Sequence, residues 1–276
     1  MPDALPPIYL ATAVETVLRA GALQMAHFGH ADLHVAKKGT IDLVTDIDLQ
    51  VERMFRDLIA ERFPDHRVLA EEFEAAGDRD DIPPFCWVFD PIDGTTNYAH
   101  GLPIFCSAVS LEIDGRPSVA AIYDPSRREL FTAERGGGAR LNGMPLRVSA
   151  AAELIDSLLC TGFPYTVHEE AQELVGLFGA FLGRTRAVRR LGSAALDLAY
   201  VAAGRFDGFY EQQLNPWDIS AGALIVEEAG GRATDIAGGP FESRRGEVVA
   251  SNGRIHDAIV ETIRAYRVSR SRNRTQ

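Results

Sequence analysis

The chain has few cysteines, a deficit of basic residues and no long apolar run. Its three cysteines, Cys86, Cys106 and Cys160, are far apart and form no CxxC pair, which argues against a disulfide framework and a structural zinc site. No apolar segment approaches membrane-spanning length, and the N-terminus carries acid and proline where a signal peptide would be basic. We therefore expect a soluble cytoplasmic protein with no membrane partner.

The charge balance restricts the partners that this protein can attract. The sequence contains 28 Lys and Arg residues and 39 Asp and Glu residues, so the formal net charge is -11. Such a surface opposes nucleic acid and anionic membrane, and an anionic substrate would need a cation that reverses the sign locally. With 46% hydrophobic residues, the 276-residue chain can still bury a substantial core.

The first half of the sequence predicts two helices followed by a sheet. Apolar residues at helical spacing predict an amphipathic helix over 8–28, ended by Gly29. Thr45 and Asp48 form a capping-box pattern that begins a second helix, which reaches Pro64. Short apolar runs between Gly, Pro and Asp turns then predict an antiparallel sheet, with strands at Arg67–Ala70, Phe85–Asp90, Phe105–Ile113, Ser118–Tyr123 and Glu129–Ala133.

The second half alternates strands with helices, which is typical of an α/β arrangement. We expect an N-terminal α+β half over 1–146 and a C-terminal α/β half over 147–276. The predicted elements are strand Ser157–Thr161, helix Glu169–Leu182, strand Ala187–Arg189, helix Ala194–Ala203, strand Phe206–Glu211, helix Trp217–Glu228, strand Glu247–Ser251 and helix His256–Tyr266. The basic segment after this last helix is expected to be a frayed, solubilising terminus.

The strongest local signal is the segment WVFDPIDGTTN, where an apolar strand ends in two carboxylates. Asp90 and Asp93 can share hard cations through their oxygens, with Pro91 fixing the turn between them. Gly94 and Thr95 open a short helix whose amide groups suit a phosphate. Taken alone, the two acids could equally make Asx-turns and caps around a tight connection.

Three further segments accompany this one: GTIDLVTDID, LAEE and NPWDISAGALIVEEAGG. In their order and wording the four segments resemble the signatures of the inositol monophosphatase family, over about residues 37 to 231. The resemblance implies a layered α-β-α-β-α sandwich of the inositol monophosphatase and fructose-1,6-bisphosphatase type, with a metal site between the two halves. It also implies lithium sensitivity and a homodimer.

The resemblance further assigns metal and catalytic roles. The implied metal ligands are Glu71, Asp90, the Ile92 carbonyl, Asp93 and Asp218. They are hard oxygen donors that favour two or three Mg²⁺ ions and tolerate Mn²⁺. Glu72 could replace Glu71, because neighbouring strand residues point in opposite directions, and Asp218 could simply complement the dipole of a helix that begins at Pro216. The implied catalytic group is Asp48, Glu71, Asp93 and Thr95.

Phosphate and substrate contacts follow from the same resemblance. The phosphate would be held by Gly94, Thr95 and Lys37, although Lys38 is easily confused with Lys37. The substrate would be met by Asp93, Ala194, Glu211 and Asp218. Glu211 could accept hydrogen bonds from polyol hydroxyls or be an ordinary strand-end acid. In the RRLGS segment, we expect Ser193 to be a helix N-cap rather than a phosphate ligand.

The predicted activity is Mg²⁺-dependent hydrolysis of a small phosphate monoester by metal-activated water, with inositol 1-phosphate as the first choice. The alternatives within this class are histidinol phosphate, fructose 1,6-bisphosphate and a nucleotide 3′-phosphate. From another class, the chain could be a regulatory binding protein of the transcription or RNA-processing machinery. The intact set of acids and the acidic pI of about 5.1 argue against that as the main role.

Overall fold

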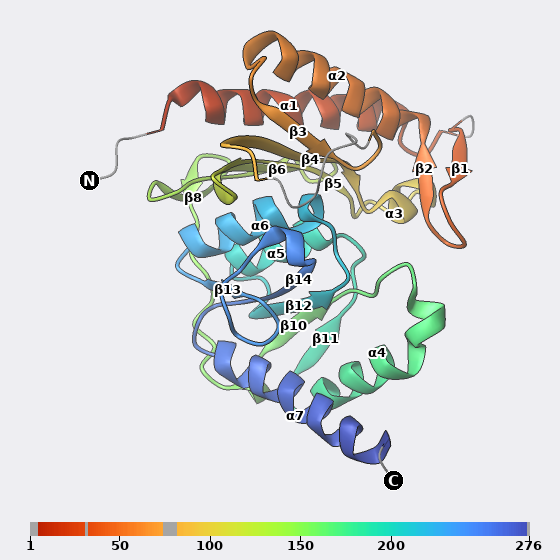
Figure 1. Cartoon of the computed structure of the whole chain (residues 1–276), viewed down its shortest axis with the longest axis vertical. Helices are drawn as coiled ribbons and strands as arrows, with labels where there is room; N and C mark the ends of the chain where they lie inside the picture. The colour runs from red at the N-terminus through yellow and green to blue at the C-terminus, as the bar shows by residue number, and fades with distance from the viewer. Residues whose placement is uncertain (1–4, 31–32, 74–81, 275–276) are drawn as a thin grey trace.

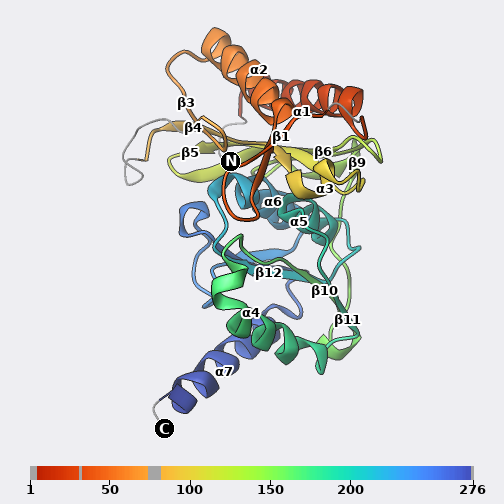
Figure 2. The same cartoon turned by 90° about the vertical axis from the view of Figure 1, so that its right-hand side faces the viewer.

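The protein is described by a computed structural model that covers residues 5–30, 33–73 and 82–274. Helices and sheets alternate in five layers, as Figures 1 and 2 show. This arrangement confirms the predicted α-β-α-β-α sandwich. Within the described residues, no helix is both long and apolar enough to cross a bilayer.

Two helices form the first layer, packed on a large sheet (Figure 1). They are α1 (Pro7–His27) and α2 (Asp46–Arg62), and the short hairpin β1 (Val35–Lys37) and β2 (Leu43–Thr45) joins them. The sheet below contains, in the described residues, β3 (Arg67–Ala70), β4 (Phe85–Asp93), β5 (Cys106–Ile113), β6 (Arg116–Asp124), β7 (Glu129–Glu134), β8 (Gly138–Leu141) and β9 (Met144–Pro145).

The middle layer consists of α5 (Ala194–Ala202) and α6 (Pro216–Glu228), which lie between the two sheets (Figure 1). The second sheet has the strand order β11 (Ala187–Arg189), β10 (Leu158–Thr161), β12 (Gly208–Gln212), β14 (Glu247–Ser251), β13 (Arg232–Thr234). The outer layer is α4 (Val167–Leu182) and α7 (His256–Arg274). Single turns occur at α3 (Thr95–Ala99), Leu154–Asp156 and Ser243–Arg245.

One apolar cluster joins the first sheet, the middle helices and the second sheet. It includes Ile122 of β6, Leu198 of α5, Ile225 of α6 and Phe209 of β12, all buried. Because this core crosses residue 146, the proposed division into 1–146 and 147–276 describes two halves that share one core, and it stays a prediction. The shared core holds α5, α6 and β12 in fixed relation to the first sheet.

Three local predictions are wrong. The first sheet is not wholly antiparallel, because β3 pairs with β4 in parallel. β4 does not end at Asp90 but continues to Asp93, with its register to β5 shifting between these two residues. The expected frayed terminus is helical, since α7 continues to Arg274. The last error arose because helix propensity in a polar, arginine-rich segment gives no apolar periodicity to detect.

Candidate active site

The end of β4 is fixed by hydrogen bonds to its carbonyl groups. The Pro91 carbonyl accepts from Gln24 Nε2 at 2.8 Å and from Ser107 Oγ at 2.7 Å. The Ile92 carbonyl accepts from Thr95 Oγ1 at 2.8 Å. Gly94 follows with φ 96°, and a Cβ there would lie 2.9 Å from the Ile104 carbonyl oxygen. The turn into α3 therefore needs glycine, and it brings Asp93 and Thr95 to one point.

Asp93 links this turn to the start of α5. Its carboxylate accepts hydrogen bonds from Ser193 Oγ at 2.6 Å, from the Ala195 amide at 2.7 Å and from the Ala194 amide at 3.3 Å. Ser193 does stand at the N-cap position, but its side chain caps nothing. The predicted capping role is wrong because the hydroxyl donates to Asp93 instead. The segments 93–95 and 193–195 thus meet although they are distant in sequence.

Asp218 and Asp48 are held by capping boxes of their own helices. Asp218 accepts from the Asn215 amide at 2.6 Å at the start of α6, where Pro216 is the first residue. Asp48 accepts from the Thr45 amide at 2.8 Å and, at 3.3 Å, from Thr95 Oγ1. The predicted capping box and the predicted approach of Asp48 to Thr95 are both confirmed.

The structure separates Glu71 from Glu72. After burial, the Glu71 charge is the next cause that raises the pKa of Asp90. Burial raises the pKa of Glu72 to about 7, Lys38 opposes this, and the acids that add to it are Asp48 and Glu52. Both glutamates bind Lys38 Nζ, which lies 2.8 Å from Glu71 Oε1. Glu71 is therefore the glutamate whose charge acts on Asp90. Lys38 rather than Lys37 reaches these acids, while the exposed Lys37 ends β1 and its phosphate role stays a prediction.

The acids repel one another strongly. Burial, followed by the charges of Glu71, Asp93 and Asp218, raises the pKa of Asp90 well above its usual range. Burial raises the pKa of Glu71 to about 8, although Lys38 opposes this. Burial and then Asp93 raise the pKa of Asp218. A cluster of acids that raise one another's pKa values is typical of a functional site. A bound cation would offset the repulsion between their charges.

The donor chemistry fits a hard divalent cation. Asp90 is 2% exposed, and its buried Oδ1 has no hydrogen-bond partner. A buried carboxylate oxygen without a partner is costly unless another group binds it. Within residues 5–30, 33–73 and 82–274, no three His, Cys, Asp or Glu side chains form a ready set of metal ligands. Cation binding would thus require these side chains to move, and Glu71 would have to leave its ion pair with Lys38.

A cavity of about 370 Å³ opens beside these acids. It is lined by five of the predicted site residues: Asp93, Gly94, Ala194, Glu211 and Asp218. Glu211 is the penultimate residue of β12, and burial raises its pKa to about 8. Gly162 makes room for this side chain, because a Cβ there would lie 2.1 Å from Glu211 Oε2. Glu211 is therefore a buried cavity residue and not an ordinary surface acid.

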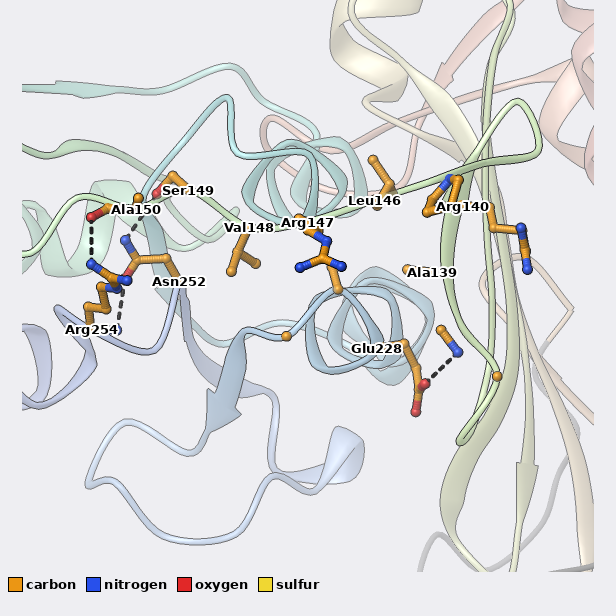
Figure 3. A pocket seen from close by; sticks show the side chains of 15 residues that line it. Ala139, Arg140, Leu146, Arg147, Val148, Ser149, Ala150, Glu228, Asn252 and Arg254 are labelled. Atoms are coloured by element: carbon orange, nitrogen blue, oxygen red, sulfur yellow. Dashed lines mark hydrogen bonds between the residues drawn. The ribbon is translucent and has the colours of Figure 1, made fainter.

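A larger cavity of about 570 Å³ lies elsewhere, between β8 and the C-terminal end of α6. Figure 3 shows Arg140, Arg147 and Arg254 spread along it, with Glu228 as its acid. Glu228 accepts hydrogen bonds from the Gly136 and Gly138 amides and is thereby held in place. With a single engaged carboxylate, this cavity does not offer the ligands of a magnesium centre.

Sequence reasoning missed Arg190 and Asp197, which the fold brings to the site, and it gave Lys38 and Ser193 other roles than the contacts they make there. Arg190 and Ser193 belong to the RRLGS segment, whose position before α5 was a usable signal. Asp197 lies one helical turn after Ser193, and nothing in its sequence context separates it from a buried first-turn acid. The described histidines His27, His30 and His34 do not line the 370 Å³ cavity, and His34 lies 3.5 Å from Asp46.

Comparison with known proteins agrees with this geometry. The model of the inositol monophosphatase family matches residues 8–267. The chain is 43% identical to Nus factor SuhB of Escherichia coli strain K12 over 254 residues, which cover 91% of this chain and 94% of that protein. It is 42% identical to an inositol-1-monophosphatase of Synechocystis sp. over 257 residues, covering 93% and 89%.

A solved structure shows the same similarity in three dimensions. The inositol monophosphatase of Anabaena (Nostoc) sp. PCC 7120 superposes with a TM-score of 0.84 at 40% identity, and the match covers 94% of this chain and 96% of that one. Both sequence and fold therefore agree over nearly the whole chain. The chain belongs to the inositol monophosphatase family.

Proposed function

We propose that this protein is a Mg²⁺-dependent phosphatase of small phosphate monoesters, with inositol 1-phosphate as its most suitable substrate. The observation that carries the proposal is a group of mutually repelling acids, the buried Asp90 and Asp93 and the half-buried Glu71 and Asp218, beside a cavity that Glu211 also lines. Similarity to proteins named inositol-1-monophosphatase supports the same activity. Mn²⁺ would be tolerated, because the donors are all oxygen atoms.

Glu71, Asp90, the Ile92 carbonyl, Asp93 and Asp218 would hold two or three ions. When bound, Mg²⁺ would lower the pKa of a coordinated water and neutralise charge on the leaving group. Thr95, whose hydroxyl lies 2.8 Å from the Ile92 carbonyl and 3.3 Å from Asp48 Oδ1, would orient the attacking water. Asp48, whose pKa burial raises to about 6, is suited to hold a proton near Thr95.

The phosphate and alcohol parts of the substrate would bind to different walls of the cavity. The backbone at Gly94 and Thr95, where α3 begins, would meet the phosphate, and Lys37 would add a positive charge. Asp93, Ala194, Glu211 and Asp218 would surround the alcohol, since all four line the cavity. We also propose a homodimer that works in the cytoplasm on a phosphorylated metabolite.

The direct test is phosphate release by the purified protein from inositol 1-phosphate, histidinol phosphate, fructose 1,6-bisphosphate and a nucleotide 3′-phosphate at matched concentration. We expect Mg²⁺-dependent, Li⁺-sensitive release, fastest from inositol 1-phosphate. Asp93→Asn, which keeps the shape of the side chain, should lower turnover at saturating Mg²⁺ by about 100-fold or more. Near-normal turnover of a folded Asp93→Asn variant would show that Asp93 has no metal or catalytic role.

A second candidate is a binding role in the transcription machinery, favoured by the 43% identity to a protein named Nus factor SuhB. It predicts little phosphate release from any substrate in the panel. It also predicts that Asp93→Asn leaves the biological role intact in cells lacking the natural protein. The panel and this complementation experiment together separate the two candidates, because only the phosphatase needs Asp93.

A further inference from the structure

Asp197 is a cavity residue with an unsatisfied acceptor. It lies in the first turn of α5, is 1% exposed and lines the 370 Å³ cavity together with Glu211. Its buried Oδ1 has no hydrogen-bond partner. Buried polar atoms in folded proteins nearly always have a partner, so an exception inside a cavity indicates a group that a ligand satisfies.

The neighbours of Asp197 do not provide that partner. The Cys160 thiol lies 4.0 Å from the Asp197 main-chain carbonyl rather than bonding Oδ1, and a thiol is only a weak donor. Arg190 also lines the cavity and opposes the effect of burial and of the Glu211 charge, which raise the pKa of Asp197 well above its usual range. A carboxyl group that holds its proton can both donate to and accept from an alcohol.

A purely structural role explains these facts less well. An acid in the first helical turn complements the dipole, and Asp197 could serve α5 in that way. The exposed amides at this helix start are already used, however, since those of Ala194 and Ala195 donate to Asp93. The Asp197 amide is likewise occupied by the Ser193 carbonyl. A role in complementing the α5 dipole therefore does not give Asp197 Oδ1 a hydrogen-bond donor.

We propose that Asp197 is a further specificity residue, which binds a hydroxyl group of the substrate's alcohol part beside the one that Glu211 is already expected to meet, so that the two acids form one subsite. The two residues line one cavity from different elements, α5 and β12. The inference rests on the proposed phosphatase function and adds Asp197 to the residues that would recognise the alcohol. An ester whose organic group carries no free hydroxyl would leave the Asp197 oxygen unpaired. The cost of this unpaired oxygen would favour polyol esters over such substrates.

The experiment compares Asp197→Leu, which keeps the size but removes the hydrogen-bonding atoms, with the unchanged protein. Inositol 1-phosphate and p-nitrophenyl phosphate serve as polyol and non-polyol substrates, at saturating Mg²⁺. We expect kcat/KM for inositol 1-phosphate to fall by about 10- to 100-fold, mainly through KM. The value for p-nitrophenyl phosphate should stay within about twofold. Asp156→Leu, an exposed acid outside the cavity, is the matched control.

An equal loss on both substrates, or no loss on inositol 1-phosphate, would overturn the subsite. If Asp197→Leu does not fold, as judged by its thermal transition, Asp197→Ala replaces it with the same expectation. The proposed function fails separately, when the unchanged protein with Mg²⁺ releases phosphate from neither substrate. Activity on p-nitrophenyl phosphate therefore shows which of the two proposals is at fault.

Discussion

Two buried acids on neighbouring strands of the first sheet have opposite surroundings. Glu112 of β5 is 0% exposed and accepts hydrogen bonds from Ser220 Oγ at 2.8 Å, Ser243 Oγ at 2.7 Å and Arg244 Nη1 at 3.2 Å. Asp90 of β4 is 2% exposed, is surrounded by other acids and keeps one oxygen without a partner. Both carboxylates are out of water, but only Glu112 is satisfied by the protein.

The difference separates a structural acid from a functional one. Glu112 ties β5 to α6 and to the Ser243–Arg245 turn, so its interactions are complete in the folded chain. The group around Asp90 is incomplete, and its repulsion is removed only by a cation or a proton. Burial of an acid alone therefore does not identify the site. A buried acid that lacks hydrogen-bond donors and a positive partner does.

The largest expected effect follows from Asp90→Asn. Turnover of inositol 1-phosphate at saturating Mg²⁺ should fall by about 1,000-fold, because an amide cannot replace an ionised metal ligand. The free energy of unfolding in EDTA at pH 7 should not fall, since the variant removes a repelling charge from a buried group. Phosphate release and urea denaturation measure the two quantities. A variant that loses stability as well as activity would place Asp90 with Glu112 as a structural acid.

Glu112→Ala should do the opposite. It leaves the Arg244 guanidinium and two serine hydroxyls without their acceptor, which we expect to lower the free energy of unfolding by about 3 kcal/mol. The kcat of the folded fraction should stay within about twofold, because Glu112 does not line the cavity. Urea denaturation and active-site-normalised kinetics test this. A large loss of kcat without loss of stability would contradict the comparison.

The sequence predicted the helices, most strands and the acids, because these depend on local patterns. Periodicity located α1 and α2, and the Thr45–Asp48 pattern located a real capping box. The resemblance to a family brought Asp218 to the same site as Asp93. That these two acids lie at one site follows from the chain topology, which local sequence patterns do not reveal.

What the sequence did not predict depends on contacts across the fold. Ser193 was expected to cap its own helix, because nothing local indicates that Asp93 lies 2.6 Å away. Lys38 and Lys37 are adjacent, and only the hairpin geometry decides which of them reaches Glu71. Asp197 has the sequence environment of a helix-start acid, so its role becomes visible only when its unpaired oxygen is seen in the cavity.

His256 extends the comparison to a satisfied titratable group outside the site. It is 0% exposed and shares hydrogen bonds with Thr234 Oγ1 at 2.9 Å and Ser251 Oγ at 3.0 Å. Burial, and then Arg232, lowers its pKa from 6.5 to about 4. Between pH 6.5 and 4 the unfolded chain therefore binds a proton at His256 that the folded chain does not bind. The contribution of His256 to the free energy of unfolding is fully present above pH 6.5 and is lost as the pH falls toward 4.

We expect this loss to be on the order of 2 kcal/mol between pH 7 and pH 4.5, measured by urea denaturation. His256→Gln should have a smaller loss over the same interval, because glutamine does not titrate. The difference between the two pH dependences isolates His256 from the acids around Asp90, whose titration is common to both proteins. Identical pH dependences would show that His256 keeps an ordinary pKa in the folded state.

The smallest expected effect concerns the substrate side of the cavity. In Gly162→Ala the new methyl group would lie 2.1 Å from Glu211 Oε2, so the glutamate must turn away while the acids around Asp90 keep their places. We expect KM for inositol 1-phosphate to rise by about fivefold, the equivalent of about 1 kcal/mol, with kcat little changed. Gly179→Ala, on α4 with open space around it, is the matched control. If kcat falls and KM does not, Glu211 acts on the reacting phosphate rather than on the alcohol, and the division of the cavity into a metal side and a hydroxyl side is wrong.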